Sequence, residues 1–326
     1  MLSDLVRRLA GLVVLLWGIT VMCFAVIHLA PGGPTAAMTD LNPKVSLQAR
    51  QRIIEFYHLN DPLPVQYGRW LKSVATLDFG RSFSDNRPVM EKIAERIPIT
   101  LAINALSMLL ILGLGIPIGI VAAARPDRRF DQATTALVFV GFSMPTFWLA
   151  LVLMRWLGVE WQWLPVSGVQ SLGAEAWPWW RQAWDVARHL ILPVGVSAFG
   201  GLAGITRYMR GSMLEALQQD YIRTARAKGL PERLVLSRHA LRNALLPIIT
   251  ILGLSIPGLL GGSVIFESIF SIPGLGRLYY ESVMSRDLMT VMGLLAISAV
   301  LTLLGNFIAD VAYAYADPRI RVGQRS

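Results

Sequence analysis

Six long apolar runs constrain the fold of this chain more than any other feature of its sequence. They are Leu9–Ala30, Ile99–Ala124, Ala133–Met154, His189–Thr206, Ala244–Phe266 and Leu288–Tyr313. An α-helix needs about 20 apolar residues to cross a bilayer, and each run is close to or above that length. A soluble protein can bury one such helix, but six predict an all-α polytopic membrane protein with six transmembrane helices. Charged residues make up only 16% of the chain, below the roughly 25% of soluble domains.

The first run also has features of a secretory signal peptide, because Arg7 and Arg8 precede it. The apolar core of a signal peptide is shorter, roughly 7–15 residues, and is followed by a small-x-small cleavage site. This run is longer and has no clear site of that kind. We therefore interpret it as a first span that is retained.

Positive charge is concentrated in alternate segments between the spans. With the N-terminus in the cytoplasm, the inner segments would be 1–8, 125–130, 207–242 and 314–326, which carry 16 Lys and Arg residues. The two short outer loops, 158–188 and 267–287, carry four. Basic residues accumulate in cytoplasmic loops, so both termini are predicted to be inside. Much of the net charge of +9 is then a topology signal and does not by itself indicate nucleic acid.

The long outer segment 31–98 is predicted to be an extracytoplasmic helical insertion. Apolar residues recur at helical spacing in Ser46–Leu59 and Asp61–Leu77, and Arg87–Leu101 reads as an amphipathic helix that leads into the second span. One face of the second helix is expected to consist of Val65, Trp70, Leu71 and Val74. The chain then divides into an N-terminal segment with the first span (1–30), the insertion (31–98) and a core of five spans (99–326).

Two shorter outer segments have distinct compositions. Gly158–Arg188 contains six tryptophans, which predict an aromatic belt at the membrane interface, with a binding surface for a ligand or partner as the alternative. In 267–287, Pro273-Gly274 and Gly276 interrupt the chain and indicate a re-entrant turn or a short helix.

Local motifs for chemistry are missing from the sequence. No GxxxxGK[ST] loop occurs, so this chain is not expected to hydrolyse ATP itself. Cys23 stands alone and four histidines are dispersed, which leaves no spacing for a metal site or a disulfide. We expect no catalytic residues, no metal and no cofactor in this chain.

Polar uncharged residues within the spans are the candidates for a translocation pathway, since the spans lack the buried acids of a proton-coupled pump. Interhelical hydrogen bonding is the alternative role for them, and for Ser143, beside the kink at Pro145, it is the favoured one. The candidates are Asn104, Ser107, Ser143, Thr146, Ser197, Thr250, Ser255, Ser263 and Asn306.

The inner segment Asp220–Pro247, "DYIRTARAKGLPERLVLSRHALRNALLP", reads as two short helices with a break between them. Gly229 suits the positive φ at a helix C-terminus, and Pro231 suits the first position of the next helix. A nucleic-acid reader, a solvated loop and a docking element are possible interpretations. A helix pair anchored between two spans has little freedom to enter a groove, so no nucleic acid is expected. Small residues at the bend, Ala225 and Ala227 with the glycine, would let another surface approach closely.

The stretches "YIRTARAKGL" and "HALRNALLPI" in this segment resemble the EAA loop of ATP-binding-cassette (ABC) importer permeases. They match the form that this loop takes in the dipeptide/oligopeptide/nickel family. Arg223-Thr224-Ala225 holds the E-A-A place and Gly229 the glycine, and Leu246-Pro247 closes the motif. The glycine lies 18 residues before Pro247, instead of 13, and Arg replaces the initial Glu, as in the peptide-transporter branch. "DPLPVQYGRWL", "DFGRSF", "GIPIGIVAA", "ESIFSIPGLGRL" and "YAYADPRIR" agree, so the resemblance extends from Arg8 to Arg321.

The resemblance implies a type I ABC importer permease with a MetI-like fold in the bacterial cytoplasmic (inner) membrane. Its partners would be a second homologous permease, two cytoplasmic ATPase subunits that bind ATP and Mg, an extracytoplasmic substrate-binding protein, a peptide substrate and the lipid bilayer. The loop at about 215–247 would couple the ATPases to the spans. The implied coupling residues are Tyr221, Arg223, Thr224, Ala225, Arg226, Ala227, Lys228, Gly229 and Leu230, with the three basic residues as rim contacts.

Other functions stay open at this point. The same family includes permeases for nickel chelates and other small solutes. A self-sufficient ion-coupled carrier or channel would transport alone and would need acids in the membrane. A membrane scaffold or sensor would carry a recognisable inner or outer domain, which the sequence lacks.

Overall fold

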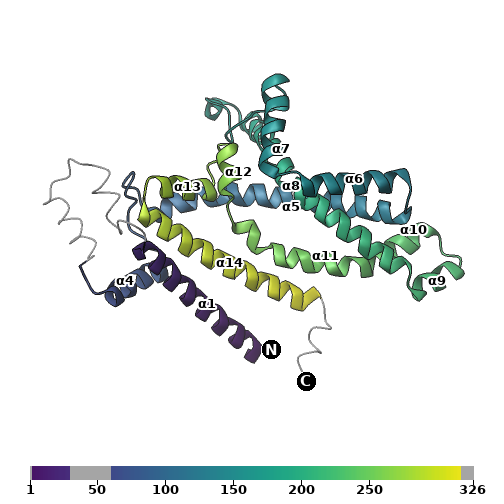
Figure 1. Ribbon diagram of the computed structural model, residues 1–326, viewed down its shortest axis with the longest axis horizontal. Coiled ribbons are helices and arrows are strands. Elements are labelled where there is room, and N and C mark those ends of the chain that lie inside the picture. Colours follow the sequence, from purple (N-terminus) through teal and green to yellow (C-terminus); the bar gives the residue numbers. More distant parts are fainter. Residues whose placement is uncertain (1, 30–59, 317–326) are drawn as a thin grey trace. The chain divides into compact units, whose positions relative to one another are not determined.

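Helices make up most of the computed structural model, which describes residues 2–29 and 60–316 (Figure 1). Within these residues there is no β-strand, only an isolated bridge between Arg81 and Pro88. The predicted all-α fold class is therefore confirmed. The helix expected at Ser46–Leu59 lies outside the described residues.

The chain divides into two compact units. The first unit comprises Met1–Thr100, Leu260–Glu267 and Pro273–Gly305. It contains α1 (Leu2–Leu29), α4 (Leu63–Thr76), α13 (Leu275–Met284) and parts of the longer helices α5 (Val89–Ala124) and α14 (Leu288–Ala316). Its core is built from Trp70, Val74, Phe79, Val89, Ile93, Leu275, Leu278, Leu294, Ala296 and Ile297. Because α5 is continuous, the predicted amphipathic helix does lead directly into the second apolar run.

Helix α4 begins after Pro62, as the Asp-Pro start predicts, and ends where Leu77 adopts a left-handed conformation with φ 55°. Trp70 and Val74 are buried as predicted, but Val65 and Leu71 are 45% and 38% exposed. The buried apolar face of α4 is therefore narrower than the sequence predicted. Polar groups also take part in the packing of α4 on α1. The hydroxyls of Thr20 and Tyr67 lie 2.9 Å apart, and His28 Nε2 lies 3.1 Å from Gln66 Oε1.

A buried carboxylate organises the start of α13. Glu267, from α12 (Val264–Ile269), accepts a hydrogen bond from the Arg277 N–H at 2.9 Å and another from the Thr100 hydroxyl at 3.1 Å. The Leu275 N–H in turn donates to Thr100 Oγ1 at 3.0 Å. The first amides of a helix have no partner within the helix, so these two side chains satisfy them and fix the turn that precedes α13.

This turn leaves no room for side chains at its glycines. A Cβ added at Gly276 would lie 2.6 Å from the backbone carbon of Ser263, and one at Gly274 would lie 2.4 Å from the Glu267 carboxylate. We expect Gly276→Ala to lower the stability of the first unit by about 1–3 kcal/mol, the usual cost of overpacking. Gly68→Ala in α4 is the matched control, because a Cβ there meets nothing within 4 Å and alanine favours a helix. Thermal unfolding in nanodiscs checks the pair, and equal midpoints for both variants would contradict the steric account.

The second unit comprises Leu101–Leu259, Ser268–Ile272 and Asn306–Ser326. Its elements, besides its share of α5, are α6 (Arg129–Ser143), α7 (Thr146–Leu153), the π-helix η1 (Met154–Glu160), the 3₁₀ turn η2 (Ala174–Ala176), α8 (Trp179–Leu217), α9 (Asp220–Ala227), α10 (Glu232–Leu234), the π-helix η3 (Val235–Ala240) and α11 (Leu241–Ser255). A short 3₁₀ helix, η4 (Pro257–Leu260), follows α11. Helices α6 and α11 both pack against α8.

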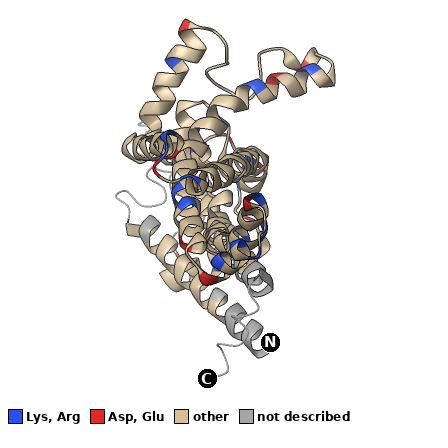
Figure 2. Ribbon diagram, turned by 90° about the vertical axis from the view of Figure 1, so that its right-hand side faces the viewer, with Lys and Arg blue, Asp and Glu red and all other residues tan. Residues whose placement is uncertain are grey.

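Three described helices are long and apolar enough to cross a membrane: Val89–Ala124, Trp179–Leu217 and Leu288–Ile308. Two bent helix pairs raise the number to five if each is one span, and an apolar stretch at Val13–Ala25 lies within α1. Most of the ribbon of the described residues is uncharged (Figure 2). The count of six spans and the orientation with both termini inside stay predictions.

Three of the predicted spans differ from the helices in the structure. The fifth, Ala244–Phe266, is interrupted, because α11 ends at Ser255 and is followed by η4 and then α12. The third, Ala133–Met154, is broken by a bend of 102° between α6 and α7. Pro145 causes the break because it lacks an N–H and holds Met144 in an extended conformation with φ −93° and ψ 119°. The fourth, predicted as His189–Thr206, is the 39-residue helix α8. Hydropathy detected only its apolar middle, whereas the polar residues at both ends continue the same helix.

Candidate functional site

The break in the inner segment is formed at Gly229, as the sequence predicts. Helix α9 ends at Ala227, and Gly229 follows with φ +75°. The Gly229 N–H donates to the Arg226 carbonyl at 2.9 Å and the Leu230 N–H to the Ala225 carbonyl at 3.4 Å, the pair of bonds of a Schellman cap. Pro231 is the N-cap residue of α10, one position before the first helical position that the sequence predicted. In Figure 1, α9 and α10 lie where α8 ends and α11 begins.

One face of α9 is anchored in the core of the second unit. Ile222 is fully buried and Ala225 is 5% exposed, and both belong to a cluster with Met213 and Ala216 of α8 and Val235 of η3. Leu230, a predicted coupling residue, packs against the same cluster. The small side chain at position 225 therefore lets α9 approach its own neighbours, which corrects the expectation that it is open to an approaching partner. Ile222 is not among the residues predicted from the sequence, although its spacing from Ala225 by three residues indicates a shared helix face.

The other face of α9 and the bend are exposed. This exposed face holds seven of the nine predicted coupling residues: Tyr221, Arg223, Thr224, Arg226, Ala227, Lys228 and Gly229. Arg226 binds Glu232 of α10 through two hydrogen bonds, Nη2 to Oε1 at 2.7 Å and Nε to Oε2 at 3.2 Å. This bidentate pair braces the bend and raises the pKa of Arg226. Arg223 lies 3.4 Å from Asp220, but both side chains are largely exposed, so this contact adds little.

Helix α9 is short, and its packing against neighbouring helices holds it in place. The buried residues of α9 lie in one packed cluster with residues from the end of α8, from η3 and from α11. Helix α11 contributes Ala244 and Ile248 to this cluster. A well-packed interior transmits displacement because it has little free volume to absorb it. A partner that pushes the exposed face of α9 would therefore move α8 and α11 with it.

The bend at Gly229 can be tested without disturbing any contact. A Cβ at this position meets nothing within 4 Å, so only the positive φ opposes a side chain. Valine in a left-handed conformation costs about 1–2 kcal/mol, whereas asparagine tolerates it. We expect Gly229→Val to keep the protein folded but to lower transport driven by its partners several-fold, and Gly229→Asn to transport normally. Equal transport by both variants in membrane vesicles would show that the bend has no role in coupling.

Four of the nine predicted pathway residues donate hydrogen bonds within the second unit. Asn104 donates to the Leu259 carbonyl at 2.9 Å and Ser107 to the Val194 carbonyl at 3.3 Å, so both form hydrogen bonds between segments of the second unit. Thr250 and Ser255 donate to carbonyls four residues earlier in α11, at 3.1 and 2.8 Å. Only the contacts of Asn104 and Ser107 join separate segments, as the alternative role of interhelical hydrogen bonding requires. Those of Thr250 and Ser255 stay within α11.

The remaining five pathway candidates differ in their exposure. Ser143 alone among the nine lines a hollow of about 540 Å³ between α6 and α8. Ser197 is half-buried, and the others, Thr146, Ser263 and Asn306, are exposed. A pathway through these residues stays a prediction.

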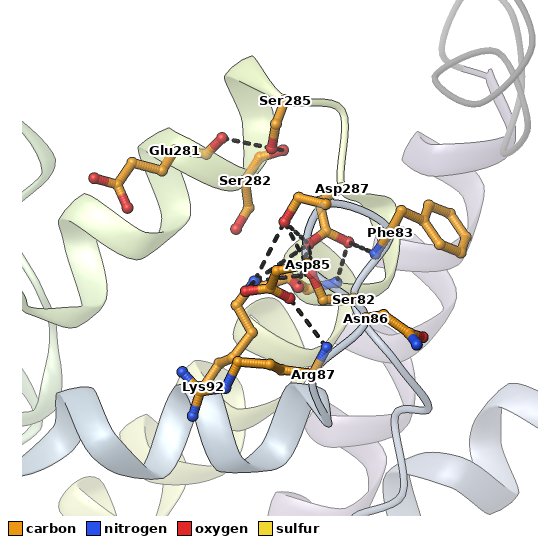
Figure 3. A network of polar contacts seen from close by, with 12 residues as sticks. Ser82, Phe83, Asp85, Asn86, Arg87, Lys92, Glu281, Ser282, Ser285 and Asp287 are labelled. Atoms are coloured by element: carbon orange, nitrogen blue, oxygen red, sulfur yellow. Dashed lines mark hydrogen bonds and ion pairs between the residues drawn. The ribbon is translucent and has the colours of Figure 1, made fainter.

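A polar network in the first unit was not foreseen from the sequence (Figure 3). Its centre is Asp287, whose side chain is 1% exposed. The Ser82 hydroxyl donates to its Oδ2 at 2.5 Å, the Phe83 N–H to its Oδ1 at 2.9 Å, and the Thr290 hydroxyl to its Oδ2 at 2.7 Å. These bonds tie the loop before α5 to the start of α14.

Lys92 of α5 completes the network. Its Nζ donates to Ser82 Oγ at 2.8 Å and lies 3.0 Å from Asp85 Oδ2 and 3.6 Å from Asp287 Oδ2. Desolvation acts to raise the pKa of both carboxyls, but hydrogen bonds outweigh it. Those from Lys92 and Ser82 hold the pKa of Asp85 at about 2, and those from Ser82 and Thr290 lower the pKa of Asp287. The loop contains the segment "DFGRSF", but Asp287 lies 205 residues away from Ser82. A single sequence cannot indicate a contact between residues so far apart in the chain.

The lowered pKa values predict how the network responds to acid. A carboxyl whose pKa is lower in the folded state adds stability above its unfolded value, about 3.9, and loses it as pH falls through the folded value. We expect the difference in thermal midpoint between the wild type and Asp287→Asn to be constant from pH 7 to about 5 and to shrink below about pH 4. A difference that does not change down to pH 3 would contradict the ionised state of Asp287.

Two family models and several curated relatives match this chain. Residues 115–322 match the family model described as binding-protein-dependent transport system inner membrane component, and residues 1–104 match the N-terminal model for the membrane component of such systems. The chain is 46% identical to the oligopeptide transport system permease protein AppB of Bacillus subtilis (strain 168), over 98% of this chain and 99% of the relative. It is 37% identical to the dipeptide transport system permease protein DppB of Alkalihalophilus pseudofirmus, over 98% and 100%, and 35% identical to DppB of Escherichia coli (strain K12), over 98% and 99%.

Proposed function

The chain belongs to the family of binding-protein-dependent transport system inner membrane components, and from this premise we propose that it is the membrane-spanning permease subunit of an ATP-driven ABC importer for peptides. It is a multi-pass protein of the bacterial inner membrane. The observation that carries the proposal is 46% identity to an oligopeptide permease over 98% of this chain. Similarity over nearly the whole length includes the spans, the outer loops and the inner segment together.

A permease of this kind works with ATPases and a substrate-binding protein, as the name of the family states for the latter. We propose that this chain pairs with a second, homologous permease, and that two cytoplasmic ATPase subunits bind ATP and Mg. The chain itself is a transport subunit, with no reaction assigned to its residues. Its contribution is to bind its partners, to open alternately to the two sides, and to pass the motion of the ATPases to the spans.

The two faces of α9 support the proposal that this chain passes the motion of the ATPases to the spans. Its exposed face holds most of the predicted coupling residues, and its buried face is packed against α8, η3 and α11. When the ATPases close on ATP, a push on α9 would bias the spans toward one of their two states. A ligand shifts such an equilibrium only by binding the two states differently, so the ATP-bound partner must fit α9 better in one state than in the other.

Peptides are proposed as the substrate because the relatives named above are permeases for oligopeptides and dipeptides. The test is uptake by proteoliposomes that contain this chain, its partner permease and ATPases, with the binding protein outside. We expect ATP-dependent accumulation of labelled di- and oligopeptides, which an excess of a nickel chelate does not compete. Accumulation of the chelate in place of peptide would overturn the substrate, and peptide uptake by this chain alone without ATP would overturn the mechanism.

A further inference from the structure

An ion pair between a buried carboxylate and a partly exposed guanidinium joins α6 to α8 in the second unit. Asp131, in the first turn of α6, is 2% exposed. Arg210 of α8 binds it through two hydrogen bonds, from Nε to Oδ1 and from Nη2 to Oδ2, the latter at 2.7 Å. The Asp127 N–H adds a third bond to Oδ2 at 3.0 Å. The carboxylate thus holds α8, α6 and the turn between α5 and α6 at one point.

Helix α5 meets α8 at the same level. A Cβ added at Gly119 of α5 would lie 2.7 Å from Met209 Cβ, 2.9 Å from the Thr206 carbonyl oxygen and 3.0 Å from the Arg210 nitrogen. The two backbones can approach this closely only because the residue is glycine. The stretch 206–210 of α8 is therefore fixed to α5 by direct backbone packing and to α6 by the ion pair.

The same stretch of α8 continues into the anchor of α9. Met209 and Met213, which flank Arg210 on α8, are both fully buried. They belong to the cluster that holds Ile222 and Ala225 of α9. Displacement of α9 would therefore act on α8 within one turn of Arg210.

We propose that the Asp131–Arg210 pair is a positioning element for energy coupling: it makes the inner parts of α5, α6 and α8 move with α9 when a partner displaces it. This inference rests on the proposed function as an ATP-driven permease. A planar guanidinium that binds both carboxylate oxygens fixes the direction of the contact as well as its distance, which a lysine ammonium does not. Without the bidentate contact, α8 could move while α6 stays behind, and ATP would be hydrolysed without the matching change in the spans.

The test uses the complete transporter, with this chain, its partner permease, both ATPases and the binding protein in proteoliposomes. Arg210→Lys keeps the positive charge for the buried Asp131 and removes the bidentate geometry. Arg207→Met is the matched control, since Arg207 lies one turn earlier on α8, is exposed, and lines the same hollow as Arg210. The quantity measured is the number of peptides transported per ATP hydrolysed, which a loss of folded protein alone does not change.

We expect Arg210→Lys to lower this ratio at least fivefold while the complex still assembles, and Arg207→Met to leave it unchanged. The double variant Asp131→Arg/Arg210→Asp, which exchanges the two charges and keeps them opposite, should recover part of the ratio. A normal ratio for Arg210→Lys, or an equal fall for Arg207→Met, would overturn the positioning role. If Arg210→Lys lowers only the amount of assembled complex, the pair is structural and the inference is also wrong.

This test separates failure of the inference from failure of the proposed function. Wild-type complex that takes up no peptide with ATP would overturn the function itself. Wild-type complex that transports, together with an Arg210→Lys variant of normal ratio, would overturn only the role of the ion pair.

Discussion

Replacing Asp287 with alanine should lower the stability of the first unit by about 3–5 kcal/mol, the cost of removing one partner from a buried charged contact. The variant leaves the Ser82 hydroxyl, the Phe83 N–H and the Thr290 hydroxyl without their acceptor. Each is a hydrogen bond to a charged group, worth about 1.5–3 kcal/mol in mutational series, and the three are not additive because they share one carboxylate.

Asp85→Ala is the matched control for this prediction. Both variants remove a carboxylate that lies near the Lys92 ammonium, but Asp85 is 41% exposed, whereas Asp287 is 1% exposed. Solvent screens the exposed pair, so its loss should cost at most about 1 kcal/mol. Thermal unfolding of the two variants in nanodiscs gives the comparison. A larger loss for Asp85→Ala than for Asp287→Ala would show that the network is not centred on the buried carboxylate.

Leucine at each of the two alanines of α9 should produce a different defect, a loss of stability at position 225 and a loss of uptake at position 227. Ala225 is buried among the residues that anchor the helix, whereas Ala227 is exposed. Ala225→Leu overpacks the cluster and should cost about 1–3 kcal/mol of stability. Ala227→Leu should change stability by less than about 0.5 kcal/mol, as most exposed substitutions do. Its expected effect is a fall of at least tenfold in ATP-driven uptake, since the larger side chain stands where the ATPase would dock.

The two leucine variants are compared by the thermal midpoint of the purified chain and by peptide uptake in proteoliposomes. Uptake by Ala225→Leu should fall together with its midpoint and recover at lower temperature, because its defect comes from packing. Uptake by Ala227→Leu should stay low at every temperature. Normal uptake by Ala227→Leu would mean that this face of α9 does not contact the ATPases.

Local features of the fold could be predicted from the sequence because each depends on residues close together in the chain. Pro62 marks the start of α4 and Gly229 the bend after α9, since proline and glycine restrict or permit particular backbone angles whatever surrounds them. The apolar runs identified the long helices for a similar reason. Their ends were less certain, because α8 continues through polar residues that hydropathy does not count.

Contacts between distant residues could not be predicted in this way. Asp131 and Arg210 are 79 residues apart, and Ser82 and Asp287 are 205 apart. Each member of these pairs reads alone as an ordinary charged or polar residue. The inward face of α9 was misjudged for the same reason. Ala225 lies in one buried cluster with Met213 and Ala216 of α8, and the sequence alone could not show which surface this alanine meets.

We propose that α9 is the point at which ATPases drive this permease, and cross-linking tests this claim most directly. Cys23 is the only cysteine of the chain, so Cys23→Ser gives a background for single cysteines. A photoreactive thiol reagent would be placed at the exposed Thr224→Cys in α9 and, as the control, at Leu172→Cys, a fully exposed position in the predicted outer loop. Thr224→Cys should cross-link to an ATPase subunit in the assembled complex, with a yield that changes when ATP is added, and Leu172→Cys should not. Cross-linking from Leu172→Cys but none from Thr224→Cys would contradict the claim.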